Sequence, residues 1–274
     1  MPSRWEVSLS GPAEAAISLT APHAVVSRWL DNPRRPKGGT VRGPRSDHGD
    51  QAKKWASGPI RAARDGHSEA GIALQVRLLD DGLADRLRAT TPPGTTVSFG
   101  AHQYQICSPT RMLDRVPWQG LRRWQGTRAW QVRFVTPACT RRRNRAAPLL
   151  APDALARGLA ERWRRLEPTS APSLPWRGAC PVWLSDLDGH SEVQILSRRA
   201  ERAGRPDRSE EILSGFLGRA RYVCDQGNEA DAACFDALLT FAAFAGAGSH
   251  TAYGFGVVIA DPTWQPPTVQ AAGR

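Results

Sequence analysis

The fold of this chain is decided by the stretch Phe241-Ala-Ala-Phe-Ala-Gly-Ala-Gly-Ser-His-Thr-Ala-Tyr-Gly-Phe-Gly-Val-Val258. It completes an apolar helix predicted over 231–245, because Cys234, Leu238 and Phe241 recur at helical spacing on one face. The glycines at 246, 248, 254 and 256 then permit positive φ and the close approach of a second backbone. Successive amides in such a loop can bind a phosphate, although a plain turn explains the glycines equally well. A nucleotide-binding loop is disfavoured, because the Walker A lysine pattern and a preceding strand are missing.

The charge balance favours a polyanionic partner. The chain has 274 residues, 41% of them hydrophobic, and a formal net charge of +11. That length can bury one sizeable core or two smaller ones. Clustered Lys and Arg gain affinity for a phosphate backbone because they release its counterions. A general preference for arginine in the composition is the alternative explanation of the excess.

The cysteines and the hydropathy pattern exclude other classes. Five cysteines are scattered along the chain, odd in number and without a CxxC motif, which predicts reduced, packed thiols, no zinc site and no cofactor. No apolar run approaches the ~18 residues of a spanning helix, and the N-terminus lacks the apolar region of a signal peptide. We therefore expect a soluble, cytoplasmic protein with no membrane partner.

Hydrophobic periodicity predicts the same order of elements twice. In the first half, strands are expected at 5–9, 59–64, 72–79 and 102–107, with helices at 23–30 and 82–89. In the second half, strands are expected at 130–135, 182–184, 193–197 and 217–223, with helices at 153–166 and 231–245 and a closing strand after the glycines. This βαββαβ order is the ferredoxin-like signature. The prediction is an α+β fold of two tandem ferredoxin-like, RRM-like domains, at 1–121 and 122–261, with an irregular tail at 262–274.

Three further segments extend the pattern of the opening stretch. They are Val132-Arg-Phe-Val-Thr-Pro137, the helix within 149–166 that Pro152 opens, and Ile212-Leu-Ser-Gly-Phe-Leu-Gly-Arg-Ala-Arg-Tyr222. In this order, with the glycine-rich stretch after them, they resemble the second domain of the Cas6 family, the endoribonucleases of the RAMP superfamily that process CRISPR precursor RNA. The resemblance covers roughly the C-terminal half of the chain.

The loop at 32–58 is the candidate catalytic segment, because it is too long and too polar for a plain connection and carries many basic residues. Metal-independent RNA cleavage needs a group that takes the proton of the attacking 2′-hydroxyl, a group that protonates the leaving 5′-oxygen, and a cation near the crowded phosphorane. Histidine suits the proton steps because its ordinary pKa lies near neutrality, and lysine suits the charge step.

The resemblance then implies individual roles. The segment His48-Gly-Asp-Gln-Ala-Lys-Lys-Trp-Ala-Ser-Gly-Pro59 matches the family in a histidine followed by a lysine, an aromatic residue and a serine-containing turn. This implies His48 as general acid/base and Lys54 as the phosphate-stabilising cation. The chain departs from the family where Trp55 directly follows the lysines and where the first 100 residues lack a tyrosine. An incidental histidine in a plain loop is the alternative, and His23, at the start of the first helix, is the second candidate.

RNA contacts are predicted in the basic loop, in an arginine cluster at 141–145 and in the glycine-rich loop. The arginine cluster lacks an acidic neighbour, unlike the arginines of the helix after it, which alternate with glutamates as ordinary surface pairs do. The residues predicted to contact RNA are Lys53, Arg141, Arg142, Arg143, Arg145, Gly246, Gly248, Ser249, His250, Gly254 and Gly256.

The implied function is a metal-independent endoribonuclease that cuts CRISPR repeats by 2′-hydroxyl attack, leaving a 5′-hydroxyl and a 2′,3′-cyclic or 3′-phosphate. Its predicted partners are precursor and mature repeat RNA, and other Cas effector subunits are a further class of partner that the sequence leaves open. One alternative is a repeat-RNA-binding effector subunit that does not cut. Another is a metabolic enzyme whose glycine-rich loop holds a small phosphorylated ligand, for which a charge of +11 is excessive.

Overall fold

The computed structural model describes residues 1–12, 17–31, 53–62, 71–142, 145–148, 151–202, 205–225 and 229–261. Three features predicted from the sequence therefore lie outside the described residues: the catalytic candidate His48, most of the loop that carries it, and the tail at 262–274. Arg143 also lies outside them.

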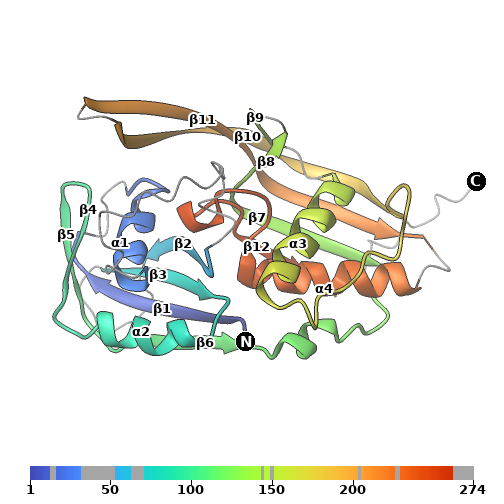
Figure 1. The fold of residues 1–274 in the computed structure, drawn as a ribbon, viewed down its shortest axis with the longest axis horizontal. Coiled ribbons are helices and arrows are strands. Elements are labelled where there is room, and N and C mark those ends of the chain that lie inside the picture. Colours follow the sequence, from blue (N-terminus) through green and yellow to red (C-terminus); the bar gives the residue numbers. More distant parts are fainter. Residues whose placement is uncertain are drawn as a thin grey trace, which may run out of the picture.

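The N-terminal half forms an antiparallel sheet with two helices (Figure 1). Its elements are β1 (Ser3–Ser10), α1 (Ala21–Leu30), β2 (Trp55–Ala62), β3 (Gly71–Leu78), α2 (Gly82–Thr90), β4 (Thr96–Phe99), β5 (His102–Ile106) and β6 (Arg111–Arg115). The strand order is β2-β3-β1-β5-β4, and β6 also pairs with β1. β5 and β6 together occupy the place of the fourth ferredoxin-like strand, so the predicted fold class is confirmed for this half.

Strict alternation builds the core of this half. Trp5, Val7 and Leu9 of β1 are buried, and the residues between them lie on the opposite, more accessible face. The buried face of α1, which includes Val26 and Trp29, belongs to the same apolar cluster. That cluster fixes one face of the sheet, so the intervening polar side chains of β1 and β2 point to the other face.

The C-terminal half repeats the order with longer elements. They are the 3₁₀ helix η1 (Trp118–Arg122), β7 (Ala129–Ala138), β8 (Thr140–Arg142), β9 (Arg145–Ala147), α3 (Pro152–Leu166), β10 (Val182–Arg202), β11 (Arg205–Cys224), α4 (Glu229–Ala245), the 3₁₀ turn η2 (Thr251–Tyr253) and β12 (Val258–Asp261). The sheet order β10-β11-β7-β12 is again ferredoxin-like, and α3 and α4 cover one face of it (Figure 1). β8 and β9 form a separate hairpin.

One part of the predicted strand pattern is wrong. The separate strands expected at 182–184 and 193–197 are parts of the single strand β10, which pairs with β11 along its whole length. The polar residues between the two expected strands are mostly exposed, because both faces of this part of the two-stranded ribbon are open to solvent. The sequence therefore lacks apolar residues there, although the strand pairing continues. The short strands β4 and β6 were not expected either.

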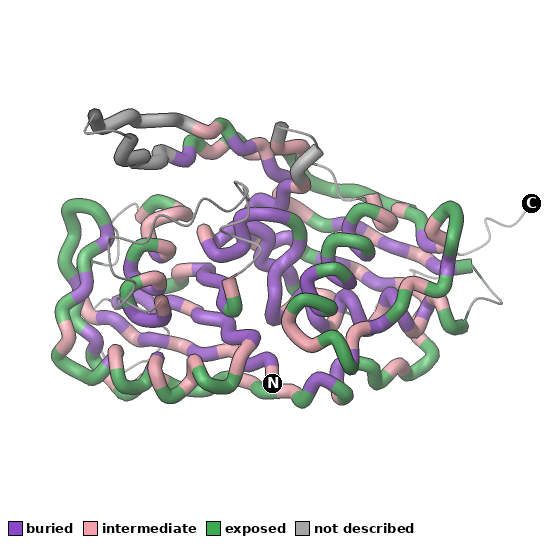
Figure 2. Tube along the Cα trace, in the orientation of Figure 1, coloured by how far each residue is buried: buried purple, intermediate pink, exposed green. Residues whose placement is uncertain are grey.

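The two halves share apolar contacts at their junction. Leu79 of the N-terminal half belongs to the apolar cluster of the C-terminal half, and Ala252 of η2 belongs to the apolar cluster of the N-terminal half. Figure 2 shows the buried stretch (purple) of the glycine-rich loop between the two sheets. The domain limits at 1–121 and 122–261 stay a prediction.

The five cysteines are free thiols, of which Cys139, Cys224 and Cys234 are buried. Among the described helices, none has both the length and the apolar character needed to cross a membrane.

Candidate nucleic-acid interface

The glycine-rich loop between α4 and β12 is built by backbone packing. A Cβ at Gly248 would lie 2.2 Å from the carbonyl oxygen of Cys139, and one at Gly256 would lie 1.9 Å from that of Ala247. Both glycines have left-handed φ values, +82° and +65°. These two positions therefore exclude any other residue for steric reasons alone, whether or not a ligand is bound.

The amides of this loop are used within the fold. Ala247 donates to the Gly256 carbonyl, Ser249 to Cys139 and Gly256 to Pro137, at 2.8 to 2.9 Å. The anion-binding concavity of free amides that the sequence suggested is wrong for these positions. Contacts of the loop with RNA remain predicted.

His250 and Ser249 lie inside the loop. The His250 side chain is 3% exposed, with Nδ1 3.1 Å from Ser249 Oγ and Nε2 3.8 Å from a carboxylate oxygen of Glu211 on β11. Its backbone is left-handed, at φ 62°. His250 thus lies buried between the loop and β11 in this structure, and its predicted contact with RNA stays a prediction.

His23, the second catalytic candidate, lies where α1 meets the glycine-rich loop. Its ring stacks on Tyr253 with centroids 3.7 Å apart, and its Nδ1 is 3.1 Å from the carbonyl oxygen of Ala252. Ser57 Oγ of β2 donates to the same carbonyl at 2.7 Å. Because a carbonyl oxygen only accepts, this hydrogen bond assigns the proton of a neutral His23 ring to Nδ1 and the lone pair to Nε2. That tautomer suits a general base.

Lys53 and Lys54, immediately before β2, are held by carboxylates. Lys53 Nζ contacts Asp31, and Lys54 Nζ lies 2.6 Å from Asp80 Oδ2. Burial alone would raise the pKa of Asp31, but hydrogen bonds from Lys53, Ser27 and Trp55 outweigh it and hold that pKa below its usual range.

The hydrogen bond from Lys54 lowers the pKa of Asp80 in the same way. The Lys54 side chain is 58% exposed, and an exposed pair of this kind contributes only about 0 to 1 kcal/mol. A phosphate can therefore replace Asp80 as the partner of Lys54 at little cost.

The arginine cluster lies on the β8–β9 hairpin. Arg141 and Arg142 belong to β8 and Arg145 to β9, where Arg142 and Arg145 are opposite each other in register. β9 also contacts β11, so the hairpin lies beside the long two-stranded ribbon that β11 forms with β10 (Figure 1). Cys139, just before β8, bridges to Ser249, so the β8–β9 hairpin begins beside the glycine-rich loop.

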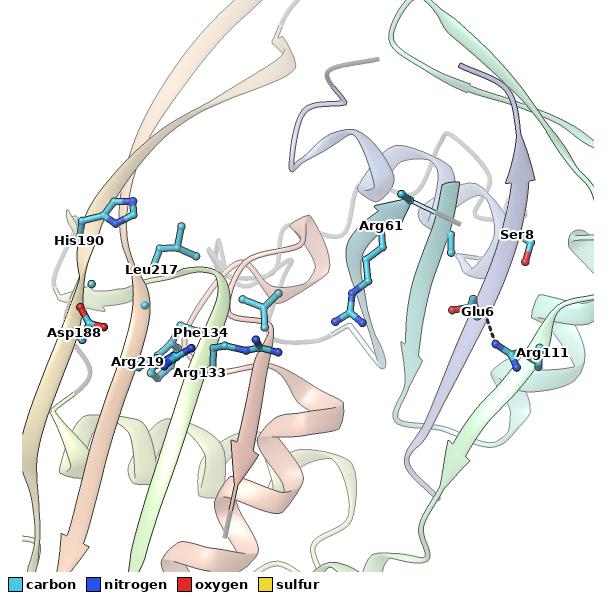
Figure 3. A pocket seen from close by; sticks show the side chains of 15 residues that line it. Glu6, Ser8, Arg61, Arg111, Arg133, Phe134, Asp188, His190, Leu217 and Arg219 are labelled. Atoms are coloured by element: carbon cyan, nitrogen blue, oxygen red, sulfur yellow. Dashed lines mark hydrogen bonds and ion pairs between the residues drawn. The ribbon is translucent and has the colours of Figure 1, made fainter. Parts of the chain in front are cut away.

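A large cleft lies between the two sheets and was not predicted from the sequence. Its volume is about 1180 Å³. Arginines from four strands line it: Arg61 of β2, Arg111 of β6, Arg133 of β7 and Arg219 of β11. Arg61 and Arg133 extend into it from opposite sides, and Arg111 pairs with Glu6 at 2.7 Å (Figure 3). We call this cleft the arginine groove.

Charges on the floor of the arginine groove are unbalanced. Arg219 is directly opposite Arg133 on one neighbouring strand and Asp188 on the other. Like charges that face each other across a sheet destabilise it, and here one carboxylate serves two arginines. An anionic ligand would offset the remainder. The sequence signal was present, since Arg133 stands between the buried Val132 and Phe134 of β7, where alternation points it away from the core.

Among the described residues, no three His, Cys, Asp or Glu side chains lie together in a way that would hold a metal ion.

Comparisons with known proteins agree with this architecture. The sequence model of the family described as "CRISPR-associated endoribonuclease Cas6" matches residues 132–258, which run from β7 to the first residue of β12. A Cas6 product complex (TTHA0078) superposes with a TM-score of 0.62 at 22% identity, over 95% of this chain and 99% of that one. Thermus thermophilus Cas6 (TTHB231) gives 0.59 at 19% identity, over 95% and 98%. At these identities the structures establish the fold. No curated protein matches the chain.

Proposed function

We propose that this chain, which belongs to the Cas6 family through residues 132–258, is an endoribonuclease that cuts CRISPR precursor RNA within its repeats. The arginine groove is the observation that carries the proposal. Four arginines from both sheets line a cleft of about 1180 Å³, and a small phosphorylated metabolite would not need positive charge from four strands. Solved Cas6 structures of the same fold include a product complex and a substrate-mimic complex.

The proposed reaction needs only groups that the chain carries. A base takes the proton of the 2′-hydroxyl, and the 2′-oxygen forms a bond to the adjacent phosphorus. The bond from phosphorus to the 5′-oxygen breaks, and an acid protonates that oxygen. The products are a 2′,3′-cyclic phosphate and a 5′-hydroxyl. We assign the proton transfers to His48 and the stabilisation of the phosphorane to Lys54.

The competing assignment is His23. Its ring is fixed by stacking on Tyr253 and by the carbonyl of Ala252, and a fixed ring with its lone pair on Nε2 is what a general base requires. Either histidine would carry out the same proton transfers, so the choice between them does not change the proposed reaction.

Cleavage is expected to proceed without a divalent metal ion, because histidine and lysine can supply the proton transfers and the charge. Purified protein should cut a repeat RNA equally fast in excess EDTA and in magnesium buffer, measured in single turnover on a denaturing gel. If the rate in EDTA disappears when the catalytic histidine is replaced with alanine, a contaminating nuclease is excluded. Loss of cutting in EDTA that magnesium restores would refute the mechanism.

Replacing Arg133 and Arg219 with alanine is expected to weaken RNA binding and to flatten its salt dependence. For each arginine that binds a phosphate in the native protein, its removal should reduce the slope of log Kd against log salt by about 0.7 to 0.9. Arg164→Ala with Arg165→Ala is the matched control, because both side chains pair with Glu161 on the helix face of the same sheet. Equal slopes for the groove variant and the native protein would show that the groove does not hold RNA.

A repeat-binding subunit that does not cut would give the same salt dependence. The two functions separate in the cleavage assay, since the non-catalytic protein would bind repeat RNA at saturation without producing a 5′-hydroxyl end.

A further inference from the structure

A second, smaller pocket opens beside the arginine groove. Its volume is about 490 Å³, within the range of roughly 300 to 1,000 Å³ typical of sites for one small ligand. Leu19, Pro59 and Val135 give it apolar walls, and Arg61 lines both this pocket and the groove. A strand whose backbone follows the groove therefore passes the entrance of the pocket.

The polar end of the pocket is formed by Glu192 and Gln194 of β10. Residues two apart on a strand share a face, and the next residue on this face, Leu196, is buried. Val193 and Ile195, on the opposite face, are 60% and 58% exposed. The amide nitrogen of Gln194 donates to Glu192 Oε1, so the two side chains are held together as one polar unit in the pocket.

A carboxylate in this position selects the ligand by its chemistry. Glu192 would repel a phosphate at this end of the pocket, away from Arg61 at the entrance. An ionised carboxylate only accepts hydrogen bonds, so its partner must present N–H or O–H groups. Bases turned out from a single strand are read in this way, on their Watson–Crick edges. Among the four bases, guanine places two adjacent donors, N1–H and the N2 amine, beside the acceptor O6.

We propose that this pocket binds one unpaired guanine of the RNA, with the Glu192 carboxylate accepting from N1–H and N2–H and the second amide hydrogen of Gln194 donating to O6. The inference deepens the proposed function and rests on it. The apolar walls cover the faces of the base, and Arg61 at the shared entrance contacts the backbone that leads to it. The pocket thus selects one nucleotide where the groove is indifferent to sequence.

The test uses decauridine and three decauridines that carry one central guanosine, adenosine or cytidine. Binding is measured by fluorescence anisotropy at one salt concentration. The guanosine oligonucleotide should bind about 5- to 150-fold more tightly than the other three, the range for one bidentate base contact. In Glu192→Gln this preference should disappear, while the affinity for decauridine stays within about twofold. Asp188→Asn is the matched control, because Asp188 lies on the same strand and lines the groove but not the pocket. This variant should keep the preference for guanosine.

Inosine in place of the central guanosine provides a readout that needs no protein variant. It lacks the N2 amine, so the native protein should bind it several-fold more weakly than guanosine. Equal binding of all four oligonucleotides, or a guanosine preference that survives Glu192→Gln, would overturn the pocket while the RNA groove stands. A preference for adenosine or cytidine would overturn the guanine assignment. Failure of decauridine itself to bind would refute the groove and the pocket together.

Discussion

His48→Ala is expected to lower the single-turnover cleavage rate by about 10²- to 10⁴-fold, the usual loss when a general acid or base is removed. RNA affinity should change little, because the histidine is assigned to proton transfer and the arginine groove to binding. The measurement is the rate of product formation under saturating protein, with the dissociation constant determined separately. A fall in affinity that accounts for the whole loss of rate would contradict the assignment.

His23→Ala is the comparison that decides which histidine acts. The His23 ring contacts Tyr253 and the Ala252 carbonyl, so its removal can also destabilise the fold. The thermal midpoint of His23→Ala is therefore measured, and His23→Gln is tested beside it as the milder substitution. If only the His23 variants are inactive while folded, α1 supplies the catalyst. If His48→Ala and His23→Ala both cut normally, neither histidine transfers the proton, and another base must do so.

A 2′-deoxyribose on the 5′ side of the scissile phosphate should abolish cleavage and leave binding nearly unchanged. The substitution removes the attacking nucleophile and keeps the phosphates that the groove would contact. Gel analysis of the deoxy-substituted repeat beside the all-ribose repeat gives the rate, and competition between the two gives their relative affinity.

The same oligonucleotide separates mechanisms that the protein variants leave together. Hydrolysis by an activated water does not need the 2′-hydroxyl, so cutting of the deoxy substrate at the normal position would exclude the cyclic-phosphate route. Deoxyribose one nucleotide further along is the control and should be cut at the normal rate.

The sequence predicted the order of the elements well where periodicity reports burial. β1, β3, α2 and α3 follow their expected limits within about two residues, because one face of each packs on a core. The ribbon of β10 and β11 was predicted poorly for the same reason. Leu187 and Ile212 are 53% and 68% exposed, and pairing between the two strands rather than burial defines the ladder.

The site was only partly predictable. His23 and Ser57 share the Ala252 carbonyl across 229 and 195 residues of sequence, and no local pattern encodes such a contact. The arginine groove forms where side chains of four strands meet, so each arginine taken alone resembles an ordinary surface residue. The glycines of the loop were identified correctly as places of close backbone approach, but the amides of Gly246, Gly254 and Gly256 donate hydrogen bonds within the fold.

The Ala252 carbonyl also sets an order in time. Translation delivers the N-terminal half first, with His23 and Ser57 in place on their elements but with the acceptor they share still to be made. Only when the ribosome has passed residues 250–256 can these residues dock against α1 and β2. The contacts of His23 are therefore completed by one of the last segments to be synthesised. A nascent chain interrupted before that segment contains the histidine but lacks Tyr253 and the Ala252 carbonyl.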